Sequence, residues 1–221
     1  MDSNRKTSII VGTLFIIATV ATLVSGLFFW SIYDLDYLTV VSTNETQILI
    51  SVLFMLTTAA AIVGIPIALF PIIKKQNESL ALGYVVSRVF EALFFIVSTI
   101  ILLAIFSLSH EFVNTSTPVT TYFETSGTLL LGVFDWSSIL LDFPFALSAV
   151  IINYLFYKSK LIPRWLSLLG LIGGGVFLAA TPLLLFGVED ATYMAAIIGI
   201  QEMVLAVWLI IKGFNASAID S

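Results

Sequence analysis

Five ionisable residues stand within long apolar stretches of this 221-residue sequence, and they are the residues most able to do chemistry. They are Arg88, Glu91, Asp135, Asp142 and Glu202. If these stretches cross a membrane, each charge near the middle of the bilayer costs roughly 2.5–3.5 kcal/mol on insertion scales. A carboxyl group kept at that cost can hold a proton or a cation, and an arginine can neutralise it. These residue types therefore indicate ion or proton binding, or structural ion pairs.

Arg88, Glu91 and Glu202 are predicted to meet inside the membrane. Arg88 and Glu91 are three residues apart, so on a helix they share a face. At 1.5 Å per residue, Glu91 lies about 10 Å and Glu202 about 14 Å from the same side of the membrane. Arg88, about 6 Å deep, is long enough to reach either carboxyl group. We include Gln201 in this candidate site because it directly precedes Glu202.

Three interpretations of this site stay open. The favoured one is a structural cluster in which Arg88, Glu91 and Glu202 hold two helices together. The functional one is that a carboxyl group of the cluster binds a proton, a cation or a polar ligand. Because two acids share one arginine, the surplus carboxyl group is a candidate proton carrier. In the third interpretation Arg88 extends to the headgroups without a specific partner.

Asp135 and Asp142 are secondary candidates on one predicted helix. They are seven residues apart, which is two turns, so they share a face but lie about 10.5 Å apart along the axis. That separation is too wide for the two groups to share a proton. One interpretation is an acidic vestibule that opens to the outer side. The favoured one is an interfacial Asp135 together with an Asp142 satisfied by local donors such as Ser138.

The elements that must position these residues are predicted to be six transmembrane helices. Hydrophobic residues make up 59% of the chain, charged residues 10%, and the mean hydropathy is +1.10. Because a bilayer core takes about 20 apolar residues and leaves no water for the backbone, each apolar stretch must form a helix. The predicted spans are residues 8–30, 48–73, 84–108, 129–157, 165–186 and 193–211. They leave no room for a soluble domain, so we expect an all-α bundle in a single domain, 1–221.

The charges of the connecting segments predict an orientation. Residues 31–47, 109–127 and 187–192 contain no Lys or Arg. The opposite side carries a set of basic residues: Arg5, Lys6, Lys74, Lys75, Lys158, Lys160, Arg164 and Lys212. The positive-inside rule therefore places both termini in the cytoplasm, in a multi-pass protein of the cytoplasmic membrane.

Several other chemistries are excluded or unsupported by composition. The chain has no Cys, which excludes disulfides, thiolate metal sites and a Cys nucleophile. A single histidine, His110, excludes bis-histidine haem and histidine-rich zinc sites. A net charge of −5 argues against a nucleic-acid partner. We predict no catalytic residue, no metal ligand and no cofactor.

Small residues predict close helix packing. Gly170 and Gly174 form a Gly-x-x-x-Gly motif in the fifth predicted span. Such motifs let helices approach closely. Packing within one chain is the favoured interpretation, and a homo-oligomer through these two glycines is the alternative. The lipid bilayer is the one partner that the sequence indicates directly.

Several ordered stretches of the chain resemble a known family. They are Ser3-Asn-Arg-Lys-Thr-Ser-Ile-Ile-Val-Gly12, Gly64-Ile-Pro-Ile-Ala-Leu69 with Lys74-Lys75, Asn77-Glu-Ser-Leu-Ala-Leu-Gly-Tyr84, Arg88-Val-Phe-Glu-Ala92, Pro163-Arg-Trp-Leu-Ser167, and Glu202-Met-Val-Leu-Ala206 with Trp208 and Lys212-Gly-Phe214. Together they resemble the uncharacterised bacterial membrane family catalogued as domain of unknown function 4386. The resemblance runs nearly end to end and implies a bacterial, multi-pass, six-helix protein. It implies no activity.

Three functions follow as hypotheses. The first is a membrane protein that binds or transports a small ligand, an ion or a proton through Arg88, Glu91 and Glu202. The second is a membrane-embedded enzyme that modifies a lipid or a quinone, for which the sequence offers no convincing set of reactive groups. The third is a structural or regulatory subunit of a membrane complex.

Overall fold

The computed structural model describes residues 3–115 and 120–218, and within these residues the chain is helical and contains no strand. Six helices of the described part are long and apolar enough to cross a membrane. The predicted all-α bundle with six spans is thus confirmed, and the chain is an integral membrane protein.

The long helices follow the predicted spans in order but differ from them in their ends. They are α1 (Ser3–Phe29), α3 (Glu45–Ile73), α4 (Glu78–Asn114), α5 (Thr120–Ser159), α6 (Arg164–Leu185) and α7 (Ala195–Ile211). Four short helical segments connect or follow them: η1 (Trp30–Tyr33), α2 (Tyr37–Thr43), η2 (Glu189–Met194) and η3 (Ala216–Ala218).

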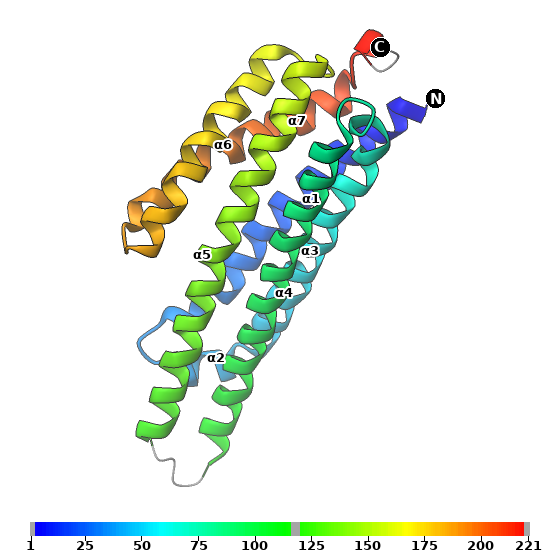
Figure 1. Ribbon diagram of the computed structural model, residues 1–221. Helices are drawn as coiled ribbons and strands as arrows, with labels where there is room; N and C mark the ends of the chain where they lie inside the picture. The colour runs from blue at the N-terminus through cyan, green and yellow to red at the C-terminus, as the bar shows by residue number, and fades with distance from the viewer. Residues whose placement is uncertain (1–2, 116–119, 219–221) are drawn as a thin grey trace.

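The helices run alternately up and down, and both ends of the described chain lie at the same end of the bundle (Figure 1). Along the chain, α1 packs on α3, α3 on α4, α4 on α5, and α5 on α6. The last helix, α7, packs on both α6 and α1. The bundle is therefore closed by a contact between its first and last spans.

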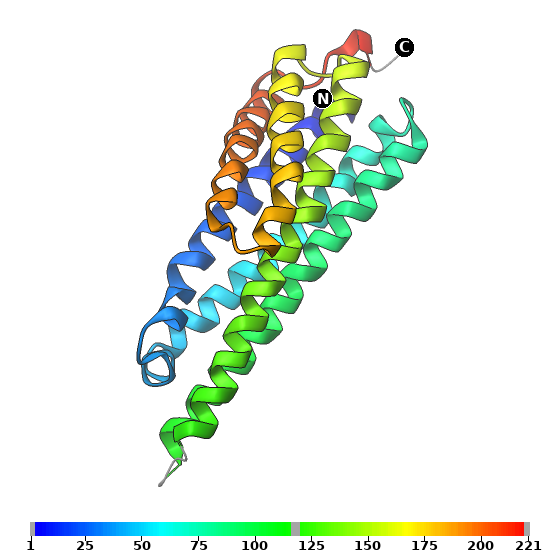
Figure 2. The same cartoon turned by 60° about the vertical axis from the view of Figure 1, so that its left-hand side comes forward.

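Helices α4 and α5 are much longer than the spans predicted for them. With 37 and 40 residues, they extend about 55 and 60 Å, against about 30 Å for a bilayer core. The two views show this pair running on beyond the other helices, away from the termini (Figure 2). Hydropathy marks only the apolar part of a helix, whereas residues such as Glu111 and Glu124 continue the same helices with polar side chains. The predicted spans end at residue 108 and begin at residue 129 because they mark the apolar part of each helix, and the helices themselves continue past these residues.

The segment expected as a plain connection between the first two spans contains a helix instead. Leu38 and Val41 of α2 are buried, and α2 packs on α4. The Ser109 hydroxyl of α4 donates a hydrogen bond to the Leu38 carbonyl. Thus α2 packs against the side of α4, near the ends of α1 and α3 that lie opposite the termini.

Arg5 joins the first and last spans at the end of the bundle that holds the termini. Its guanidinium donates hydrogen bonds to the carbonyl oxygens of Leu209 at 3.0 Å, Ile210 at 2.5 Å and Ile211 at 3.3 Å. The last carbonyls of a helix have no partner within the helix and carry partial negative charge. Arg5 therefore both pairs them and fixes α1 against α7.

Candidate functional site

Arg88 lies on the inner face of α4 and is almost completely buried, with 2% of its surface exposed. Its Nη1 lies 3.2 Å from Glu91 Oε2, one turn further along α4. Its Nη2 lies 2.5 Å from Glu202 Oε1 on α7. We refer to Arg88, Glu91 and Glu202 as the Arg88 cluster. Glu202 is ten residues before Lys212, which places the cluster about 15 Å below the basic end of α7.

Three aromatic rings surround the guanidinium group of Arg88. The rings of Phe15, Tyr84 and Phe145 have centroids 5.6, 5.6 and 5.7 Å from its central carbon. These rings come from α1, α4 and α5. A desolvated cation over aromatic faces gains electrostatic stabilisation. The free-energy cost of burying the Arg88 charge is thus offset by two carboxylates and three aromatic rings, which come from four helices.

A cavity of about 370 Å³ adjoins the Arg88 cluster. We call it the central cavity; its wall includes Arg88, Glu91, Glu202 and also Asp142 from α5. Small residues of α1 and α7 form much of the remaining wall: Ala18, Thr19, Ala195, Ala196 and Gly199. The cavity exists because these side chains are too short to fill the space between the helices.

Asp142 makes no hydrogen bond and no ion pair with any residue in the described part of the chain. The Ser138 hydroxyl, expected to satisfy it, donates instead to the Phe134 carbonyl at 3.1 Å. That favoured interpretation of Asp142 was therefore wrong. Asp142 lines the central cavity together with the Arg88 cluster, and the ion pairs of Arg88 are with Glu91 and Glu202.

Asp135 is separated from this group. Its Oδ1 accepts a hydrogen bond from the Tyr33 hydroxyl at 2.7 Å, and its side chain is exposed. Asp142 lines the central cavity and Asp135 does not, so the shared cavity contains only one of the two secondary candidates. The contact with Tyr33 ties η1 to α5.

Gln201 is fully buried but lies outside the central cavity. Its Nε2 donates to Asn153 Oδ1 at 3.0 Å, and the Asn153 side chain in turn donates to the Ala149 carbonyl at 2.9 Å. Gln201 Oε1 has no hydrogen-bond partner within the described residues. This amide pair joins α5 and α7 on the side away from Glu202.

Gly170 of α6 packs against the amide pair, and a Cβ atom at this position would collide with the Asn153 carboxamide. A Cβ at Gly174 would come within 3.1 Å of Val150 on α5. Both glycines of the Gly-x-x-x-Gly motif thus meet α5 of the same chain. A homo-oligomer through them stays a prediction.

The central cavity reaches the surface between α1 and α7. Its wall includes Leu23 of α1, 66% exposed, and Ala196 of α7, which is also exposed. Figure 2 shows that the α6–α7 hairpin ends well short of the far end of the bundle, whereas α1 continues past the start of α7. The opening therefore lies beside the start of α7, at the end of this helix that is away from the termini.

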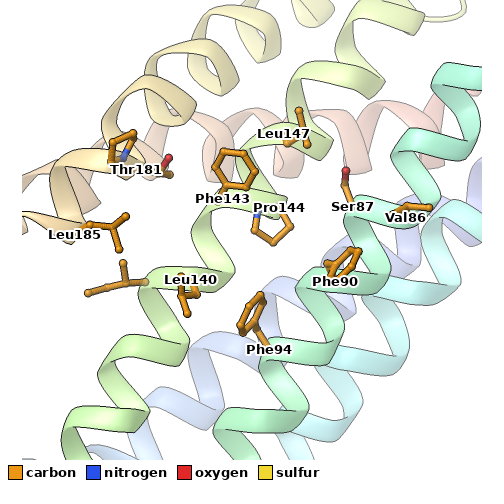
Figure 3. Close-up of a pocket in the computed structure, with 12 residues that line it drawn as sticks. Val86, Ser87, Phe90, Phe94, Leu140, Phe143, Pro144, Leu147, Thr181 and Leu185 are labelled. Atoms are coloured by element: carbon orange, nitrogen blue, oxygen red, sulfur yellow. The ribbon is translucent and has the colours of Figure 1, made fainter.

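A larger groove of about 620 Å³ lies between α4, α5 and α6 and has a different character (Figure 3). The rings of Phe90, Phe94 and Phe143 surround it. Its two hydroxyls, on Ser87 and Thr181, donate to carbonyls of their own helices. Its wall contains no charged residue, so it offers no group comparable to the carboxylates of the central cavity.

Sequence reasoning did not identify Asn153, Asp142's place in the cavity or the aromatic cage. Asn153 carried a usable signal, because a lone carboxamide in an apolar span requires a buried partner. The cage carried none, since Phe15, Tyr84 and Phe145 are ordinary members of apolar stretches.

The arrangement can hold positive charge. The central cavity is lined by three carboxyl groups against one guanidinium, and that guanidinium already contacts two of them. Buried charges are stable only when they are paired. An additional cation or proton would balance the excess of acid, and Asp142 is the group free to receive it.

Comparison with known proteins identifies a family. The model of a family described as a domain of unknown function, DUF4386, matches residues 10–213. No curated protein and no solved structure matches the chain.

Proposed function

The chain belongs to the DUF4386 family, whose function is unknown, and from the central cavity we propose that the protein binds a small cation, a proton included, within the membrane. The observation that carries this proposal is the unpaired Asp142 carboxyl beside the Arg88 cluster. An ion pair that only joins α4 to α7 does not require a third carboxyl group in the same cavity.

The charge balance supports a cation over an anion. Arg88 is the one basic residue in the wall of the cavity, and two carboxylates and three rings surround it. An anion would therefore meet no free positive group and would face three acids. A cation would meet Asp142 first and would share Glu91 or Glu202 with Arg88.

The proposal keeps the orientation predicted from charge, with both termini in the cytoplasm. The basic residues of the α3–α4 turn, Lys74 and Lys75, lie at the same end as the termini, and so do Lys158, Lys160 and Arg164 of the α5–α6 turn. In this orientation the start of α7, where Ala195 and Ala196 line the cavity, lies toward the outer side of the membrane, so the cation enters from that side. The enzyme and the subunit hypotheses stay predictions, because no feature described above favours either.

The first test is a binding measurement with a matched pair of variants. Asp142→Asn removes the unpaired carboxyl, whereas Asp135→Asn makes the same change two turns away on an exposed face of α5. Purified protein in nanodiscs is heated in lithium, sodium, potassium, ammonium or methylammonium chloride at constant ionic strength. We expect at least one cation to raise the unfolding temperature of the wild type and of Asp135→Asn but not of Asp142→Asn, because a ligand stabilises the state that binds it.

If the cation is a proton, infrared spectroscopy replaces the salt series. A carbonyl band of a protonated carboxyl group should then appear between neutral and acidic pH in the wild type and in Asp135→Asn, and should be missing in Asp142→Asn. The proposal is wrong if no cation stabilises the wild type and no carboxyl band depends on Asp142. Cation or proton flux into liposomes, measured for the same variants, separates a transporter from a protein that only binds.

A further inference from the structure

A second polar hollow, separate from the central cavity, lies at the end of the bundle that holds the termini. It has a volume of about 570 Å³ and lies between the α5–α6 turn, the end of α7 and the chain that follows α7. We call it the basic hollow because its wall contains Lys160, Arg164 and Lys212. No other hollow described above contains three basic residues.

These three cations are exposed and form no ion pair with a carboxylate of any described residue. The guanidinium of Arg164 lies 5.3 Å from the centroid of the Tyr157 ring, which orients the group but does not neutralise it. Like charges gathered around one hollow repel one another unless an anion lies between them. The basic hollow is therefore complementary to an anionic group.

The backbone around the basic hollow is held in place by the fold. The Asn215 backbone N–H donates to the Leu161 carbonyl at 2.9 Å, so the chain after α7 is fixed to the α5–α6 turn. Gly213, which begins this segment, has a φ of 77°, a conformation that glycine adopts without strain. The hollow is thus a feature of the backbone and not only of flexible side chains.

An apolar groove of about 420 Å³ adjoins the basic hollow along α7. The two share Trp208 and Lys212, and the groove continues over Val207, Val204 and Met203. From Lys212 to Met203 the helix advances about 13 Å toward the middle of the membrane. The polar, basic hollow thus continues into an apolar groove along the surface of α7, and Trp208 lies at the boundary between them, where tryptophan is favoured.

We propose that the basic hollow and the adjoining groove form a binding site for an anionic phospholipid. The phosphate group lies among Lys160, Arg164 and Lys212, and one acyl chain follows Val207 and Val204 along α7. Basic pockets at helix ends are a known form of lipid headgroup recognition. A free phosphate ion would use the basic hollow alone and would leave the groove without a role, which is why the proposal names a lipid.

The test measures lipid retention on the purified protein in detergent by native mass spectrometry. Dioleoyl phosphatidylglycerol and dioleoyl phosphatidylcholine, which share their acyl chains and differ in headgroup charge, are added at equal concentration. The wild type should retain phosphatidylglycerol in preference. The triple variant Lys160→Gln, Arg164→Gln, Lys212→Gln should lose up to about a hundredfold in affinity, because each basic residue contributes about fivefold toward an anionic lipid.

The matched control removes three other basic residues from the same end of the bundle: Lys74→Gln, Lys75→Gln, Lys158→Gln. This control should keep the wild-type affinity, since none of the three lines the hollow. An equal loss in both triple variants would mean diffuse attraction and would overturn the site. Equal retention of both lipids by the wild type would also overturn the proposed site. Complete displacement of the lipid by inorganic phosphate would overturn it as well. Each result is independent of cation binding in the central cavity.

Discussion

Gln201 and Glu202 are neighbours in the sequence and polar residues in the same apolar helix, yet their surroundings differ completely. They point about 100° apart around α7. Gln201 faces α5 and α6, where it bonds Asn153 and no space remains beside Gly170. Glu202 faces α1 and α4, where it meets Arg88 beside a cavity of about 370 Å³.

The two faces of α7 show that buried polar side chains can have two different roles. At Gln201 the amide pair is enclosed, so its hydrogen bond serves to hold α5 and α7 in register. At Glu202 the small residues of α1 and α7 leave open space beside groups whose charges exceed those needed for pairing. Only the second arrangement can exchange a partner with its surroundings. Variants on the two faces of α7 should therefore differ in what they change as well as in how much.

Removing Arg88 should have the largest effect on stability. Arg88→Met keeps much of the side-chain volume but leaves Glu91 and Glu202 without their cation. Breaking a buried ion pair by removing one partner costs about 3–5 kcal/mol of unfolding free energy. Reversible unfolding in mixed micelles measures the loss, with the exposed Lys75→Met as control, for which a change within about 0.5 kcal/mol is expected. A small loss of unfolding free energy in Arg88→Met would contradict the proposed difference between the two faces of α7.

Adding one methyl group on the amide side should have an intermediate effect. Gly170→Ala places a Cβ against the Asn153 carboxamide, and overpacking of this kind costs about 1–3 kcal/mol. Gly175→Ala is the matched control on the same helix, because its Cβ would meet nothing within 4 Å. This control should gain up to about 1 kcal/mol from improved helix propensity. If both substitutions behave alike in the same unfolding assay, the amide pair is not enclosed.

The hydrogen bond of the amide pair should have the smallest effect. A double-mutant cycle with Asn153→Ala and Gln201→Ala isolates the interaction between the two side chains. Such couplings between membrane helices average about 0.6 kcal/mol. Cation binding should be unchanged in Gln201→Ala, because Gln201 does not line the central cavity. Loss of binding in this variant would instead make the two faces of α7 one site.

The spans and the depths of charges could be predicted from sequence, because both depend on quantities that add along the chain. Apolar length gave six helices, and a rise of 1.5 Å per residue placed Glu91 and Glu202 at similar depths. Those depths agree with the contacts of Arg88 to both groups in the structure. The predicted spans did not indicate how far α4 and α5 continue as helices, since a helix does not stop where its side chains become polar.

The neighbours of a residue across the bundle could not be predicted, because they depend on the order and rotation of the helices. Asp142 was expected to be satisfied by local donors such as Ser138, whereas Ser138 donates to Phe134 and Asp142 lines the central cavity. Gln201 was placed with Glu202 because the two are adjacent in sequence. Adjacent residues of a helix point about 100° apart, however, so the two side chains lie on different faces of α7. The depth of a residue follows from its position along one helix, whereas the wall of a cavity depends on how several helices are arranged.

The pairing of Arg88 with Glu202 also has a consequence for biosynthesis. During synthesis α4 enters the membrane well before α7, so Arg88 meets Glu91 first and Glu202 only when the last helix arrives. The contact of Arg5 with the final carbonyls of α7 forms at the same late stage. A chain truncated before residue 195 would keep its first five spans but leave an incompletely neutralised arginine facing lipid. We expect such truncated chains to be degraded far faster than the complete protein in pulse-chase labelling. The protein would then become resistant to degradation only after α7 has made its contacts with α1 and α4.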